Sequence, residues 1–281
     1  MSTLVPPLFA GLVDDASVLP PGVGSFQEAV DANAQHRASW YRDLLGPFLV
    51  PSSVLHRNIP PAGLSVGVVN DAPIDVLPQA VAKLRAAGVI VRHVEAPVAR
   101  RGEDPQPGLA TLRELSASWT DLDVYAEVPL SWGLLAALDT LADAHAGGLR
   151  IAPKFRIGGL AGELFPTPVE LAAVICACRD RRLPFKLAAG MRHALRHTDP
   201  ETGFTHHGFL NVLVASFVAV DGGEVAEVAE TLAATHPVPL VEPTRARRAG
   251  SRPLWVGFGA ISVMDPLTEL IRLGLIDGGF A

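Results

Sequence analysis

The sequence predicts an α/β protein of the (β/α)₈ barrel type, formed by residues 1–281 as a single domain. Short apolar segments alternate about eight times with segments of helical spacing, which is typical of a parallel sheet. The length of 281 residues is normal for one such barrel, and a hydrophobic content of 49% can fill a large core. No Gly-x-Gly-x-x-Gly motif follows the first apolar segment, so the open dinucleotide-binding sheet lacks its fingerprint.

The first half of the chain contains five expected strands, because these segments are short, apolar and bounded by turn residues. They are residues 9–13, 64–69, 89–94, 123–128 and 149–157. Ser25 and Glu28 form a capping box that predicts a helix to about residue 45, where Gly46-Pro47 ends it. Further helices are expected over residues 76–87, around 109–115 and over 131–145.

The second half is expected to be irregular around the seventh strand. A capping box at Thr167 and Glu170 opens a helix, and residues 185–188 form the sixth strand. Residues 209–220 are apolar nearly throughout, and their length favours a helix over a strand. The remaining expected elements are a helix over 224–234, a short seventh strand over 238–241, a last strand over 254–258 and a helix from Asp265-Pro266 to Gly274.

The net charge and the cysteine content indicate which classes of partner and which cellular compartment to expect. A net charge of −6 argues against a nucleic-acid partner, since basic surface supplies most of that affinity. The two cysteines, Cys176 and Cys178, lie two apart on an expected helix and cannot face each other, which fits a reducing cytoplasm. We expect no signal peptide, no membrane partner and no cofactor, and the sequence leaves open whether the chain forms a homo-oligomer.

Charged residues gather on one face of the expected sheet. Strand residues alternate between faces, so the charged ones share the side opposite the apolar ones. These residues are His93, Glu95, Tyr125, Glu127, Lys154, Arg156 and Lys186. One interpretation is a set of ion pairs that plugs the barrel. The other is an active site at the carboxyl ends of the strands, where barrel enzymes keep their chemistry.

The two lysines predict Schiff-base chemistry. Lys154 and Lys186 lie on adjacent expected strands, and their repulsion would depress the pKa of one ammonium toward neutral pH. Lys154 is the expected nucleophile, because Arg156 and Lys186 both add positive charge near it, and Glu127 is the expected general acid/base. The reversed lysine roles, and a proton-abstracting isomerase with Lys186 as the base, stay open.

A loop of histidines and arginines follows the sixth expected strand. His193 or His207 is expected to close over the substrate, and Arg192 and Arg196 indicate that the substrate is anionic. Zinc binding by His193, His197 and His207 is the less favoured alternative, so no metal is expected. Other expected substrate-binding residues are Arg156, His207, Asn211, Glu95, Asp15 and Asn70.

The segments Lys154-Phe-Arg-Ile-Gly-Gly and Phe185-Lys-Leu-Ala-Ala-Gly-Met-Arg resemble the paired-lysine strands of deoxyribose-phosphate aldolase. That resemblance implies a class I aldolase in which the first lysine forms the Schiff base and the second tunes it. The sequence departs from the family in three ways. The Thr-Ser-Thr after the family's first lysine is absent, most of its acidic relay is absent, and the two lysines lie on the fifth and sixth expected strands instead of the sixth and seventh.

The chain also resembles a bacterial family of (β/α)-barrel proteins, which implies the fold but no activity. The resemblance rests on the Asp14-Asp15 and Pro20-Pro21-Gly22 loop, the two lysine strands, the loop of histidines and arginines, and Gly208-Phe-Leu-Asn211. Together these observations predict a barrel enzyme that acts on a small anionic carbonyl compound by Schiff-base chemistry. The alternatives are a metal-independent isomerase and a non-enzymatic barrel that binds a small anion.

Overall fold

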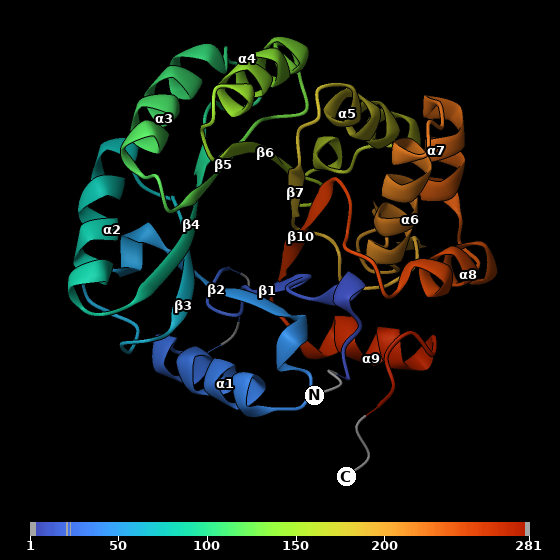
Figure 1. Cartoon of the computed structure of the whole chain (residues 1–281), viewed down its shortest axis with the longest axis horizontal. Coiled ribbons are helices and arrows are strands. Elements are labelled where there is room, and N and C mark those ends of the chain that lie inside the picture. The colour runs from blue at the N-terminus through green and yellow to red at the C-terminus, as the bar shows by residue number, and fades with distance from the viewer. Residues whose placement is uncertain (1–3, 21, 23, 279–281) are drawn as a thin grey trace.

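The chain folds into a closed barrel of parallel strands in a computed structural model that describes residues 4–20, 22 and 24–278. Pro21 of the expected Pro-Pro-Gly loop lies outside the described residues. The strands follow one another around the barrel in chain order, and the first pairs with the last (Figure 1). They are β1 Val13–Asp15, β2 Leu45–Pro51, β3 Ser65–Val69, β4 Ile90–Pro97, β5 Asp123–Glu127, β6 Ile151–Arg156, β7 Phe185–Ala188 and β10 Trp255–Ala260. This confirms the predicted (β/α)₈-type barrel.

Helices cover the outside of the barrel (Figure 1). They are α1 Phe26–Ala38, α2 Leu77–Ala86, α3 Gln106–Ser118, α4 Leu134–Ala146, α5 Pro168–Asp180, α6 Phe209–Val220, α7 Val225–Ala233, α8 Val238–Arg247 and α9 Met264–Arg272. The link from β2 to β3 carries the short 3₁₀ turn Ser52–Val54 in place of an α-helix. A short antiparallel hairpin of β8 His197–Thr198 and β9 Thr205–His206 follows β7. Among the described residues, no helix is both long enough and apolar enough to cross a membrane.

Local signals placed several helices correctly. Both expected capping boxes form, at Ser25 with Glu28 and at Thr167 with Glu170. In each box the side-chain oxygens and the backbone N–H groups satisfy one another at the start of the helix. The long apolar segment is the helix α6, as its length predicted, and ten of its side chains are buried.

The start of the barrel differs from the prediction. The segment expected as a strand over residues 9–13 holds the 3₁₀ turn Pro7–Phe9, and β1 begins at Val13. The helix expected to reach residue 45 ends at Ala38, and β2 follows it. Gly46 and Pro47, which indicated a helix end, are part of β2. Proline is tolerated there because β2 shifts register against β1 between Leu45 and Phe48.

The seventh expected strand is also wrong. Residues 238–241 begin the helix α8, with Pro239 in its first turn, where the missing N–H costs no hydrogen bond. The sequence prediction lacked β2 and contained this extra strand, so it had the right number of strands but placed each strand from β3 to β7 one position too early in the barrel. Lys154 therefore lies on the sixth strand of the barrel, β6, and Lys186 on the seventh, β7.

Candidate functional site

The predicted charged face is the interior of the barrel. Parallel pairing sets Glu127 of β5 beside Lys154 of β6, and Lys154 beside Lys186 of β7. Strand alternation points these side chains inward while apolar neighbours such as Phe155 and Leu187 pack outside. Glu95, Lys154 and Lys186 are each no more than 3% exposed. Buried charges of this kind must be paired.

Lys186 lies in the middle of the barrel and has three polar partners. Its Nζ donates hydrogen bonds to Asp14 Oδ2 and Glu95 Oε1. It also lies 3.2 Å from His93 Nε2, which itself is 3.1 Å from Glu95 Oε1. The ring of Tyr125 covers the ammonium, with Nζ 5.0 Å from its centroid. These contacts enclose Lys186 on several sides.

Lys154 contacts the residue at the carboxyl end of β5. Its Nζ is 2.7 Å from Glu95 Oε2 and 2.7 Å from Glu127 Oε2. Glu127 is the last residue of β5 and also accepts a hydrogen bond of 3.2 Å from Arg156 Nε. The side chains of Glu127 and Arg156 are 18% and 48% exposed, so Lys154 is one side chain away from solvent at this end of the barrel.

The six charged groups form a chain of alternating sign through the barrel. In order they are Asp14, Lys186, Glu95, Lys154, Glu127 and Arg156. Three carboxylates thus balance three cations. Glu95 is the central member, because one of its oxygens binds each lysine.

The expectation that the two lysines depress each other's pKa is wrong for this arrangement. Burial lowers the pKa of Lys154, but the charges of Glu95 and Glu127 outweigh it and raise that pKa above the ordinary value. Asp14 and Glu95 do the same for Lys186. Conversely, both lysines hold the pKa of Glu95 well below its usual range against the effect of burial. Both ammonium groups are therefore charged in the resting protein.

Glycines on neighbouring strands make room for this network. A Cβ at Gly67 of β3 would lie 2.1 Å from His93 Nε2, and one at Gly46 of β2 would lie within 1.8 Å of Asp14 Oδ1. No side chain fits at either position without moving its neighbour. The strands β2 and β3 therefore contribute space, where the strands opposite contribute charge.

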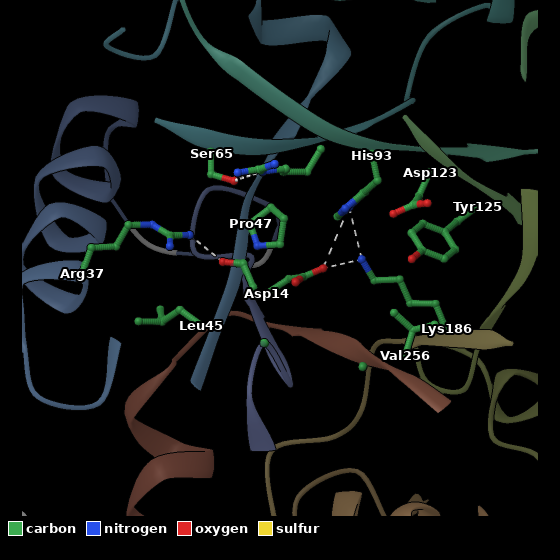
Figure 2. Close-up of a pocket in the computed structure, with 14 residues that line it drawn as sticks. Asp14, Arg37, Leu45, Pro47, Ser65, His93, Asp123, Tyr125, Lys186 and Val256 are labelled. Carbon is green, nitrogen blue, oxygen red and sulfur yellow. Dashed lines mark hydrogen bonds and ion pairs between the residues drawn. The ribbon is translucent and has the colours of Figure 1, made fainter. Parts of the chain in front are cut away.

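A cavity of about 340 Å³ reaches Lys186 from the amino-terminal ends of the strands (Figure 2). Its inner end is lined by Asp14, His93, Tyr125 and Lys186. Its outer part is lined by residues that open strands or precede them, including Gly11, Leu45, Ser65 and Asp123. We expected polar chemistry only at the carboxyl ends, so this cavity was not predicted.

Four of the expected substrate-binding residues hold other parts of the fold together. Asp15 accepts hydrogen bonds from Asn33 of α1 and from the Ser17 backbone. Asn70 accepts a hydrogen bond from Ser52 Oγ and donates one to the Ala72 carbonyl.

Asn211 and His207 tie the loop after β7 to the helices. Asn211 accepts from the Arg196 backbone and donates to the carbonyls of Thr231 and Ala234. His207 Nε2 lies 2.8 Å from the Pro166 carbonyl oxygen, and burial lowers the pKa of His207 to about 4. The structure brings none of these four residues into contact with the two lysines.

The histidine loop forms an aromatic cluster at the surface of the barrel. The rings of His193 and His197 lie 4.3 Å apart, and those of His197 and His206 stack at 5.1 Å. His193, which is half exposed, approaches Glu269 of α9 and not Lys154 or Lys186. His207 points away to Pro166, so the trio of His193, His197 and His207 is not gathered around one point.

Within the described part of the chain, the one group with three potential metal ligands close together is Asp14, His93 and Glu95. The ammonium of Lys186 contacts all three, so it takes the position that a metal cation would need. The three side chains therefore cannot hold a metal ion while the Lys186 ammonium occupies the space between them.

Sequence reasoning placed Glu95, Glu127, Lys154, Arg156 and Lys186 together correctly, from strand alternation alone. It put His93 and Tyr125 on the same inward face but gave them no role in the site, and it gave none to Asp14. The two-residue spacing placed His93 and Tyr125 on that face, but it does not show which members of the face contact the lysines. Comparison with models of known protein families gives no match, and comparison with curated proteins gives none either.

Proposed function

We propose that the protein is a barrel enzyme that traps a small anionic carbonyl compound as a Schiff base on Lys154. The observation that carries the proposal is the position of Lys154 between two carboxylates, at the end of the network that approaches solvent. Barrel enzymes act at the carboxyl ends of their strands, and Lys154 is the lysine that contacts Glu127, the last residue of β5.

The use of lysine at both central positions supports chemistry over simple ion pairing. The sequence has 23 basic residues, and the lysines among them are Lys83, Lys154 and Lys186. Arginine, with its rigid fork of donors, is the usual choice for buried ion pairs. An amine is needed where nitrogen must lose a proton and form a bond to carbon.

Glu127 is suited to move the proton that this reaction requires. In the first step the Lys154 ammonium passes a proton to Glu127 Oε2, 2.7 Å away, and the free amine attacks the carbonyl carbon. The carbonyl oxygen takes up that proton and becomes a hydroxyl. Glu127 then accepts a second proton from the nitrogen and passes it to the hydroxyl, so that the C–O bond breaks and water leaves. The iminium that remains carries one positive charge, as the ammonium did. Glu95 therefore stabilises the product of this step as it stabilised the starting state.

Lys186 acts in this proposal by sharing Glu95. Because Glu95 binds both lysines, the charge of Lys186 weakens the hold of Glu95 on Lys154. Arg156, exposed beside Glu127, is positioned to bind the anionic group of the substrate. His193, by contrast, lies beside Glu269, so we give it no part in the proposed steps.

The resemblance to class I aldolases gains support from two observations. The lysines lie on the sixth and seventh strands, so the difference in strand placement noted from the sequence disappears. Three acidic residues contact the lysines: Asp14 pairs with Lys186, Glu127 pairs with Lys154, and Glu95 pairs with both. The lyase class therefore remains part of the proposal.

Two alternatives fit parts of the same geometry. A balanced chain of buried charges is also what a non-catalytic barrel would use to fill its interior. An isomerase with Lys186 as its base has less support, because Asp14 and Glu95 raise the pKa of Lys186 and keep it protonated despite burial.

Borohydride trapping tests the proposal. The protein is incubated with a panel of small aldehydes, keto acids and their phosphates, reduced, digested and mapped by mass spectrometry. We expect an adduct on Lys154, and none in Lys154→Met. Lys83, which donates to the Leu55 and His56 carbonyls away from the network, is the internal control. An adduct on Lys186 alone would reverse the lysine roles, and turnover of a substrate without any adduct would exclude the Schiff base.

A further inference from the structure

Two arginines line the outer part of the cavity that reaches Lys186 from the amino-terminal side. Arg37 belongs to the last turn of α1, and Arg92 to the beginning of β4. Figure 2 shows Arg37 on the far side of Pro47 from Lys186, so the arginine and the lysine lie at different ends of the cavity. This face is opposite to the one at which the proposed chemistry takes place.

Neither guanidinium forms a direct ion pair with a carboxylate of the described residues. Arg37 donates to Asn33 Oδ1 at 3.2 Å and to the Gly46 carbonyl, and Arg92 Nε donates to Ser65 Oγ at 3.3 Å. These acceptors are uncharged. Among the residues that the structure describes, no carboxylate oxygen lies within 4.0 Å of a guanidinium nitrogen of either arginine, which is the limit for an ion pair. The two carboxylates that line the cavity are already used, Asp14 by Lys186 and Asp123 by Arg150 at 2.7 Å.

The two arginines also act on each other. Burial lowers the pKa of Arg37, the carboxylates of Asp15 and Asp14 oppose that effect, and the positive charge of Arg92 adds a smaller lowering of the pKa. Two cations held near one another in a cavity wall repel, and an anion between them relieves that repulsion. The hydrogen bonds to Asn33 and Gly46 meanwhile fix the Arg37 guanidinium in the cavity wall.

We infer that Arg37 and Arg92 form a second binding site, which takes the anionic group of a small organic phosphate or carboxylate at the amino-terminal face. The rest of such a ligand occupies the cavity, whose inner end offers His93, Tyr125 and Lys186 as polar contacts. A ligand bound here meets Lys186 from the side opposite to Lys154. The site is thus separate from the proposed Schiff-base lysine but joined to it through Lys186 and Glu95.

The test is calorimetric titration with inorganic phosphate and, separately, with acetate at constant ionic strength. Arg92→Met is the informative variant, because Arg92 has one side-chain hydrogen bond to lose and is exposed, so the fold should tolerate the change. Arg113→Met, on the exposed face of α3, is the matched control. Thermal unfolding of each variant checks that it is folded.

We expect wild type to bind one of the two anions and Arg92→Met to bind it about tenfold more weakly or worse, since a charge-assisted contact is lost. The anion bound more tightly identifies the ligand class. Arg113→Met should bind like wild type. Equal affinity in wild type and Arg92→Met, or no binding of either anion to wild type, would overturn the inference.

Discussion

Glu95 is the residue on which the interior of the barrel depends most. Its two carboxylate oxygens bind different lysines, and its Oε1 also lies 3.1 Å from His93 Nε2. The side chain is 2% exposed, so water cannot replace a missing partner. A buried ion pair adds little net stability when intact, but breaking one leaves a buried charge without compensation.

We therefore expect Glu95→Gln to lower the free energy of unfolding by about 3–5 kcal/mol. The neutral amide keeps the shape of the side chain but leaves Lys154 and Lys186 with one negative charge fewer. Urea denaturation measures the change, with Glu114→Gln on the exposed side of α3 as the control. A loss no larger than that of a surface pair, about 1 kcal/mol or less, would show that the network is not held together through Glu95.

His207 gives the protein a predictable response to acid. Burial lowers its pKa to about 4, while an unfolded histidine titrates near 6.5. Between these values the unfolded chain binds a proton that the folded chain does not, so stability falls as pH falls from about 6.5 toward 4. Below the folded pKa the loss is complete, and above the unfolded pKa the contribution is fully present.

The expected loss from this group between pH 7.5 and pH 5 is about 2 kcal/mol of unfolding free energy. Denaturant titrations at both pH values measure it. His207→Gln keeps a donor for the Pro166 carbonyl but cannot titrate, so its stability should change less over the same range. His56→Gln, at an exposed position, serves as the control. Identical pH profiles for wild type and His207→Gln would contradict the assignment.

At the scale of elements, register decides which side chains meet. β3 pairs with β4 so that Gly67 lies beside His93, and β4 pairs with β5 so that Glu95 lies beside Tyr125. The imidazole of His93 occupies the space that a side chain at Gly67 would need. The His93 and Tyr125 rings pack edge to face, with their centroids 5.3 Å apart. The strand β3 thus positions His93 without contributing a polar group.

This packing predicts that Gly67→Ala destabilises the protein by about 1–3 kcal/mol, the usual cost of overpacking. The added Cβ would lie 2.1 Å from His93 Nε2, so the imidazole must move away from Lys186 and Glu95. Gly162→Ala is the control, because a Cβ there would contact Phe204 Cε1 at an ordinary 3.6 Å. Thermal unfolding of both variants tests the prediction, and equal unfolding temperatures would refute it.

At the scale of the whole molecule, closure of the barrel completes the charge network. Asp14 lies on the first strand and Lys186 on the seventh, 172 residues later, yet they form an ion pair. Pairing of β1 with β10, and of β10 with β7, brings them together (Figure 1). Asp14 can reach Lys186 only if the sheet closes, because an open sheet would leave β1 at an edge.

The sequence by itself determined the fold class, most of the helices and the inward face of charged residues. These follow from local causes: capping residues, helical spacing, and the alternation of side chains along a strand. It misplaced β1, missed β2 and made a strand of the first turn of α8. Those segments are short and contain glycine or proline, whose conformation is decided by the neighbouring strands and helices and not by local preference.

The tertiary structure alone decided the protonation of the two lysines. From the sequence, two neighbouring lysines repel, and one pKa should fall. In the closed barrel Asp14, Glu95 and Glu127 come from three other strands and reverse the sign of that shift. The cavity at the amino-terminal face was likewise invisible in the sequence, since Arg37 and Arg92 lie 55 residues apart and on different elements. Electrostatic energy depends on distances in space, which the order of residues along the chain does not contain.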